Sequence, residues 1–125
     1  MALIRNIHTA PMSKVDLPGV QGATISVMVG REDNAPHFAL RSIEVEPGGN
    51  TPHHAHDYEH EVYVVSGNGH VLLEGTRHPI KAGDVVFVPA NEEHEFTAAE
   101  GTDEPLKFLC VVPVEQNCGG EVPGS

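Results

Sequence analysis

Short segments in which apolar and polar residues alternate run along this chain, and turns separate them. The segments rich in β-branched and aromatic residues are 24–30, 37–46, 60–66, 70–75, 84–89, 94–99 and 106–113. Turn-forming sequences such as EPGGN, SGNG, KAGD and PANEE connect several of them. No stretch places apolar residues at the three- and four-residue spacing that an amphipathic helix needs. The pattern predicts an all-β domain, a sandwich or a barrel of antiparallel strands.

A dense group of ionisable side chains, HHAHDYEH, occupies residues 53–60. Along an extended segment, side chains two positions apart point to the same side, with Cα atoms roughly 6.6 to 7 Å apart. His54 and His56 can therefore lean onto one ion, whereas His53, one residue out of step, should face away. This spacing indicates a metal site.

Composition narrows the choice of partner. The chain has 125 residues, the size of one domain, and 18 acidic residues against 7 basic ones give it a net charge of −11. Such a charge repels nucleic acids and anionic membrane surfaces, so we expect a small molecule or a second copy of the chain as the partner. No apolar run reaches the roughly 20 residues of a membrane span, and no secretory signal begins the sequence. A cytoplasmic location follows by default.

The two cysteines do not form a metal-binding pair. Cys110 and Cys118 lie eight positions apart, and neither belongs to a CxxC sequence, which argues against a structural zinc knuckle. We expect two reduced thiols, with Cys110 packed in a strand.

Two spaced motifs resemble those of the cupin superfamily. They read Gly48-x5-His54-x-His56-x3-His60-x6-Gly67 and Gly83-x5-Pro89-x-Asn91-x2-His94. The resemblance implies a single-domain cupin, that is, a double-stranded β-helix or jelly-roll barrel. It also implies a barrel core over residues 36–114, an N-terminal segment over 1–35 that pairs with the barrel or with a dimer partner, and a C-terminal tail over 115–125.

The resemblance also implies the metal ligands. Cupins commonly place a glutamate at the position before the final six residues of the first motif, and here that position holds His60. Glu61 fits the spacing from His56, but it leaves only five residues before the closing glycine and faces outward by strand alternation. We therefore expect four histidine ligands, namely His54, His56, His60 and His94.

Four neutral ligands leave a divalent ion with its full charge, which favours an anionic or enolisable guest. If the ion is six-coordinate, two positions stay open for a chelating substrate or for a substrate and dioxygen. Small cupins commonly hold manganese or iron, so the resemblance favours one Mn(II) or Fe(II) per chain. Nickel, copper and zinc also suit imidazole ligands.

Further residues are candidates for the lining of the substrate pocket. Arg41 is either a charge at a sheet edge or a cavity residue that anchors an anionic substrate. Phe108 and Cys110 share the inward face of their strand, where they either approach the metal or form ordinary core. Glu59 and Glu61 either accept hydrogen bonds from ligating histidines or are solvated. We expect the remaining histidines to lie at the surface: His8, His37, His53, His70 and His78.

Three functions are compatible with such a site. By analogy with the family, the leading one is a metal-dependent oxidoreductase of the dioxygenase type, acting on a small oxygen-bearing organic substrate. The alternatives are a small-molecule-binding cupin without turnover and a metal-dependent isomerase or lyase. Residues 24–30 are apolar enough to need a partner sheet, so we expect a homodimer.

Overall fold

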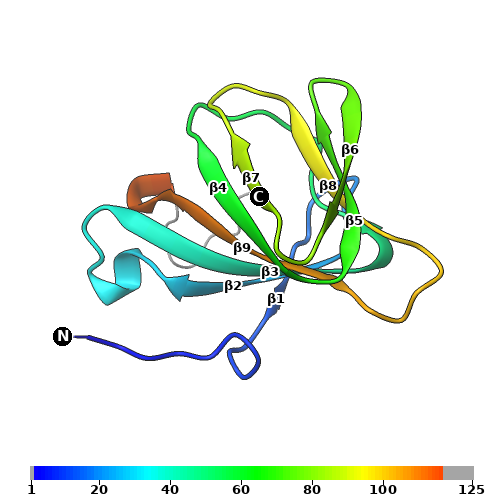
Figure 1. Ribbon diagram of the computed structural model, residues 1–125. Helices are drawn as coiled ribbons and strands as arrows, with labels where there is room; N and C mark the ends of the chain where they lie inside the picture. The colour runs from blue at the N-terminus through cyan, green and yellow to red at the C-terminus, as the bar shows by residue number, and fades with distance from the viewer. Residues whose placement is uncertain (1, 117–125) are drawn as a thin grey trace.

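The computed structural model describes residues 2–116, which fold into one curled antiparallel sheet (Figure 1). Its strands are β1 (Ser13–Lys14), β2 (Gln21–Val29), β3 (Phe38–Asn50), β4 (His60–Ser66), β5 (Asn68–Leu73), β6 (Thr76–Lys81), β7 (Val85–Val88), β8 (His94–Ala98) and β9 (Leu106–Pro113). The strand order is β6-β5-β8-β3-β9-β4-β7, with β2 paired to β3 and β1 to β2. Two short 3-10 turns, η1 (Arg31–Asp33) and η2 (Val114–Gln116), are the only helical elements in the described part. The all-β single-domain prediction is confirmed.

The core lies inside the curl of this sheet. Val62 and Val64 on β4 are buried, while Tyr63 between them is exposed, as alternation predicts. Phe96 of β8 and Phe108 of β9 stack with ring centroids 4.6 Å apart and join the two sides of the curl. In Figure 1, β4 and β7 rise on one side and β5, β6 and β8 on the other, above β3 and β9. His60 on β4 and His94 on β8 approach each other from these two sides, with their Nε2 atoms 3.2 Å apart.

Three elements differ from the sequence prediction, of which the first is the two-residue strand β1, which pairs with β2 and lies outside the expected segments. Strand β6 was not expected because TRHPIK carries few β-formers, and only Ile80 of this strand is buried. It lies at one end of the strand order, where Pro79 is tolerated because an edge strand does not need every N–H. The sequence EPGGN predicts a turn, but β3 continues through it to Asn50, with a register shift opposite β2 and a positive φ of 79° at Gly48.

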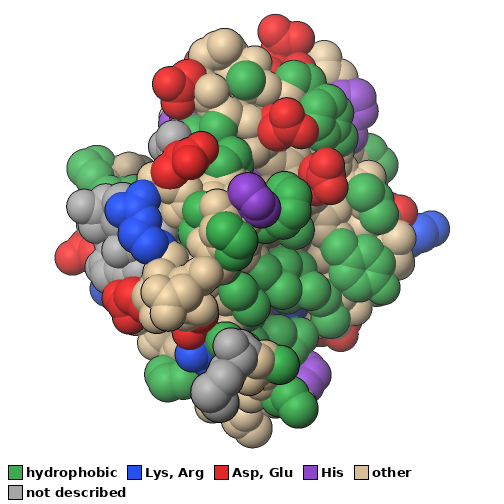
Figure 2. Space-filling view, turned by 90° about the vertical axis from the view of Figure 1, so that its left-hand side faces the viewer, with side chains coloured by type: hydrophobic (Ala, Val, Ile, Leu, Met, Phe, Trp, Pro, Cys, Tyr) green, Lys and Arg blue, Asp and Glu red, His purple; other side chains and the backbone are tan. Residues whose placement is uncertain are grey.

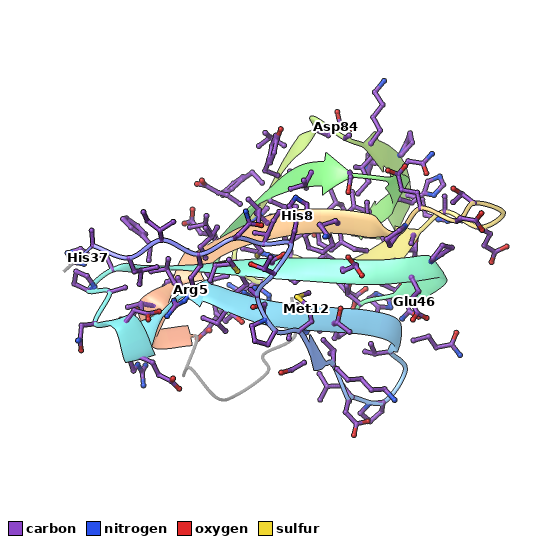
Figure 3. The ribbon with its side chains drawn as sticks, turned by 90° about the horizontal axis from the view of Figure 1, so that it is seen from below. Arg5, His8, Met12, His37, Glu46 and Asp84 are labelled. Carbon is purple, nitrogen blue, oxygen red and sulfur yellow. The ribbon has the colours of Figure 1, made fainter. Side chains whose placement is uncertain are left out.

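The N-terminal segment lies across β2 and β3 (Figure 3). Arg5 forms an ion pair with Asp33 at 2.8 Å and donates a hydrogen bond to the carbonyl of Met28 at 2.7 Å. Strand β2 pairs along its length with β3 of the same chain. The expected tail over residues 115–125 falls almost wholly outside the described residues. Within residues 2–116, no helix is long and apolar enough to cross a membrane.

Asn91, which replaces the glycine common at this point of the second motif, adopts the left-handed conformation with φ of 67°. Its N–H donates to the carbonyl of His56 at 2.6 Å, so this turn connects both halves of the site. Asparagine tolerates positive φ better than other non-glycine residues. We expect Asn91→Ala to lower the free energy of unfolding by about 1 kcal/mol, and Asn91→Gly to leave it nearly unchanged, as measured by urea denaturation. Equal losses in both variants would contradict this account.

Candidate metal centre

Main-chain hydrogen bonds hold the two motifs against each other. The N–H of His54 donates to the carbonyl of His94 at 3.1 Å, and the N–H of His94 donates back at 2.9 Å. Thr51 extends the contact, because its N–H donates to the carbonyl of Phe96 at 2.9 Å. The segment around His54 is therefore an isolated bridge beside β8 rather than the continuous strand that alternation assumed. The side-chain directions still follow the predicted pattern.

Three histidines converge on one point. One imidazole nitrogen from each of His54, His56 and His94 lies within 4.8 Å of the other two. His60 enters the same space from β4, and its Nε2 lies 3.2 Å from Nε2 of His94. The four histidines differ in burial: His54 and His56 are half-buried, whereas His60 and His94 have no exposed surface. The three-histidine cluster suits a divalent metal ion.

The remaining histidines lie away from this cluster. His53 is exposed, and its Nε2 lies 3.1 Å from a carboxylate oxygen of Glu93, which confirms that it faces away. His8 and His37 are exposed as well (Figure 3), as is His78, while His70 is half-buried.

Hydrogen bonds at the second ring nitrogens set the tautomers of two ligands. The Nδ1 atoms of His56 and His94 lie 2.9 Å from the carbonyl oxygens of Tyr58 and Glu92, respectively. A carbonyl can only accept, so both rings carry their proton on Nδ1 and direct an Nε2 lone pair toward the cluster. Within residues 2–116, the buried Nε2 of His56 has no hydrogen-bond partner. A buried acceptor without a donor is what a metal ligand requires.

Burial keeps His56 and His60 neutral. Desolvation is the main cause that lowers the pKa of His56 from 6.5 to about 4 and that of His60 from 6.5 to about 2. The neighbouring imidazoles and Arg41 act in the same direction on both rings. Neutral imidazole is the form that binds metal, so His56 and His60 need no deprotonation at neutral pH.

Arg41, Phe108 and Cys110 have no exposed surface, and Arg41 and Cys110 lie beside the histidines. Arg41 does not lie at a sheet edge, because β3 is paired on both sides by β2 and β9. Its Nη2 donates to the sulfur of Cys110 at 3.1 Å, and within the described residues its Nε and Nη1 have no hydrogen-bond partner. The same sulfur lies 2.9 Å from Nδ1 of His60. The assignment of these residues to a substrate pocket stays a prediction.

Two further features of the site were not expected. Tyr58 stacks on His56 with ring centroids 3.9 Å apart and an interplanar angle of 6°. Burial raises the pKa of Tyr58, so its hydroxyl stays protonated at neutral pH. The hydrogen-bond partners at Nδ1 of His56, His60 and His94 are two carbonyls and a thiol, not Glu59 or Glu61, which are both exposed. Of the two alternatives that the sequence leaves open for Glu59 and Glu61, exposure to solvent is the one found at these three histidines.

The lowered pKa values predict a pH-dependent stability of the metal-free protein. Unfolded histidines bind a proton near pH 6.5, whereas His56 and His60 in the fold resist protonation down to about pH 4 and 2. The unfolded state therefore binds more protons below pH 6.5, and stability falls as the pH decreases from there. For buried His60 the slope is up to about 1.4 kcal/mol per pH unit. Urea denaturation between pH 7 and 5 should show a shallower slope for His60→Gln, and equal slopes would contradict the assignment.

Comparison with known families and structures identifies proteins of similar sequence and fold. The family model Cupin_2, described as a cupin domain, matches residues 41–112. The structure of the polyketide cyclase RemF from Streptomyces resistomycificus is similar with a TM-score of 0.84 and 31% identity. The similarity covers 91% of this chain and 80% of that one.

Two curated relatives match a shorter part of the chain. A 1-methylthio-D-xylulose 5-phosphate methylsulfurylase from Rhodospirillum rubrum is 35% identical over 78 residues, which are 62% of this chain and 49% of the relative. An oxalate-binding protein from Thermotoga maritima is 37% identical over 71 residues, which are 56% of this chain and 57% of the relative. The chain thus spans about half the length of these two relatives.

Proposed function

Because the chain belongs to the Cupin_2 family, we propose that it binds one divalent transition metal ion and acts on a small anionic or enolisable molecule. The proposed ligands are His54, His56, His60 and His94. One observation carries the proposal: the buried Nε2 of His56 has no donor among the described residues and belongs to a cluster whose nitrogens lie within 4.8 Å.

The inclusion of His60 rests on its distance from His94. Two imidazole nitrogens bound to one ion at about 2.1 Å lie about 3.0 to 3.4 Å apart for octahedral to tetrahedral angles. The Nε2 atoms of His60 and His94 are 3.2 Å apart, which fits this range. Glu61, the alternative ligand, is exposed on the outer face opposite Phe87. The geometry therefore favours a fourth imidazole over a carboxylate.

The charge of the site favours an anionic guest. Four imidazoles bring no negative charge, and Arg41 adds a buried positive charge that contributes to the lowered pKa values of His56 and His60. The field of Arg41 reaches the site even though its side chain has no exposed surface. An oxygen anion of a carboxylate or an enolate would therefore be stabilised at the histidine cluster.

The candidate reaction classes differ in the role of the ion, which either stabilises a charged substrate oxygen or also takes part in oxidation by dioxygen. When bound, a divalent ion supplies Lewis-acid stabilisation of negative charge on a substrate oxygen. The sequence alone ranks a dioxygenase-type oxidoreductase first. The similarity to a polyketide cyclase over 91% of the chain instead favours enolate chemistry without oxidation, which belongs to the isomerase or lyase alternative. The dioxygenase remains the second candidate because four protein ligands leave open coordination positions, and the oxalate-binding relative favours a non-catalytic binder as the third.

The test begins with elemental analysis of protein purified without added metal or an affinity chelator. We expect near-stoichiometric metal, with Mn(II) or Fe(II) favoured and Ni, Cu or Zn as alternatives. Oxygen consumption and product formation would then be followed with a panel of small enolisable compounds. Turnover without oxygen uptake supports the enolate reaction, and turnover with uptake supports the oxygenase. A protein that takes up no metal even after reconstitution would contradict the proposal.

We also propose a homodimer through the outer face of the sheet. Phe38, Val85 and Phe87 expose 71%, 73% and 54% of their surfaces, and hydrophobic side chains gather on the face shown in Figure 2. Light scattering after size exclusion should give twice the mass of one chain. Phe87→Asp should shift it to the monomer, whereas Thr76→Asp on the exposed edge strand β6 should not. A monomeric wild-type protein would contradict this.

A further inference from the structure

The thiol of Cys110 connects a proposed metal ligand to a buried charge. Its sulfur lies 2.9 Å from Nδ1 of His60 and accepts a hydrogen bond from Nη2 of Arg41 at 3.1 Å. Strand register places these groups together, since Cys110 on β9 pairs with Arg41 on β3 and with Val62 on β4. None of the three polar side chains has exposed surface. The partner of His60 is thus fixed by strand pairing rather than by a loop.

His60 differs from the other two rings in what its Nδ1 meets. The carbonyls at His56 and His94 can only accept, so they keep the ring proton on Nδ1. A thiol both donates and accepts, so Cys110 is compatible with either tautomer of His60. On the other side of the ring, Nε2 of His60 lies 3.2 Å from Nε2 of His94, which carries a lone pair because the proton of His94 is on Nδ1. Two lone pairs at this distance need a proton or a cation between them.

We propose that Cys110 is a positioning residue that serves both tautomers of His60, an inference that rests on the proposed metal site. In the metal-free protein, the thiol donates to Nδ1 of His60, and the Nε2–H of His60 donates to His94. In the metal-loaded protein, Nε2 needs its lone pair, so Nδ1 carries the proton and donates to the sulfur. One proton leaves Nε2 to water and one reaches Nδ1 from water, and the charges of the ring and the thiol do not change.

Arg41 has the same role in both states. Its Nη2 donates to the sulfur whether the thiol hydrogen points to His60 or away from it, because sulfur has a second lone pair. The guanidinium therefore fixes the position of the sulfur while the thiol hydrogen rotates. The sulfur therefore keeps the His60 ring in the same direction through the change of tautomer. Hydrogen-bond partners of ligating histidines generally fix the ring in this way.

The experiment is ¹⁵N NMR of histidine-labelled protein, metal-free and loaded with Zn(II), with the His60 signals assigned by their loss in His60→Gln. We expect His60 to carry its proton on Nε2 without zinc and on Nδ1 with zinc. His56 and His94 should carry it on Nδ1 in both states. Zinc affinity, measured by competition with a chelator, should fall about 10- to 100-fold in Cys110→Ala and less than about threefold in Cys110→Ser, which retains a donor and an acceptor.

Val112→Ala is the matched control, because Val112 is the next buried residue on the same face of β9. It should leave the zinc affinity and the tautomer of His60 unchanged. Two results overturn this inference alone: an Nδ1 proton on His60 in both states, or zinc affinity in Cys110→Ala equal to that of the wild type. A wild-type protein that binds none of zinc, manganese, iron, nickel and copper would instead overturn the proposed function together with the inference.

Discussion

His60→Ala is expected to reduce bound metal from about one ion per chain to below about 0.2, while the sheet stays folded. The substitution removes one of four proposed ligands and leaves the main-chain bridge between His54 and His94 in place. Because His60 is completely buried, the alanine also leaves a cavity, so His60→Gln serves as a second variant of similar volume. Elemental analysis gives the metal content, and circular dichroism reports the fold.

Two neighbouring substitutions are the controls for this result. Glu61→Ala changes an exposed side chain on the outer face and should leave the metal content within about 10% of wild type. His53→Ala removes an exposed imidazole beside Glu93 and should have as little effect. Loss of metal in Glu61→Ala with retention in His60→Ala would show that the fourth ligand is the carboxylate. Loss in His53→Ala would show that the direction of the whole segment is wrong.

Arg41→Met is expected to raise the free energy of unfolding by about 1 to 4 kcal/mol. The guanidinium is completely buried, and within residues 2–116 it has no carboxylate among its hydrogen-bond partners and only the sulfur of Cys110 as a partner for Nη2. Burial of a charge without an opposite charge costs several kcal/mol, and methionine fills a similar volume without that cost. Urea denaturation of the metal-free protein measures the change.

The same substitution should weaken the binding of an anionic ligand, because it removes the positive charge behind the histidines. A stable protein with poorer affinity for a small carboxylate would indicate that Arg41 is kept for the site at the expense of stability. Arg77→Met on β6 is the control, since Arg77 is exposed and should change stability by less than about 0.5 kcal/mol. Destabilisation by Arg41→Met would mean that Arg41 has a compensating partner in solution.

Much of the fold was predictable because apolar and polar residues alternate along strands that bury one face. The limits of β4 and β9 agree with the expected segments 60–66 and 106–113, where every second side chain is buried from residue 60 to 64 and from 106 to 112. Strand β6 lacks this signal, since its side chains are exposed except Ile80. The pattern of apolar residues reports burial, so it cannot detect a strand that exists mainly through its pairing with β5.

The convergence of His54, His56 and His94 followed from motif spacing, but their partners did not. Tyr58 and Glu92 contribute main-chain carbonyls, and any residue with the same backbone geometry would offer that acceptor. The contact between His60 and Cys110 joins positions 50 residues apart and depends on the register of β4 with β9. Register is set by the whole sheet, so a local reading of the sequence contains no signal for this contact.

Because the bridge between His54 and His94 is made by the main chain, the alignment of the two motifs does not depend on which side chains bind the metal. The hydrogen bonds that align the two motifs are made by N–H and C=O groups, which every residue except proline carries in full. An imidazole at either position can therefore be exchanged for a carboxylate, an amide or an apolar side chain without loss of the alignment. A scaffold of this kind allows the set of ligands to diversify by single substitutions, each tested by selection on a backbone that is already in place.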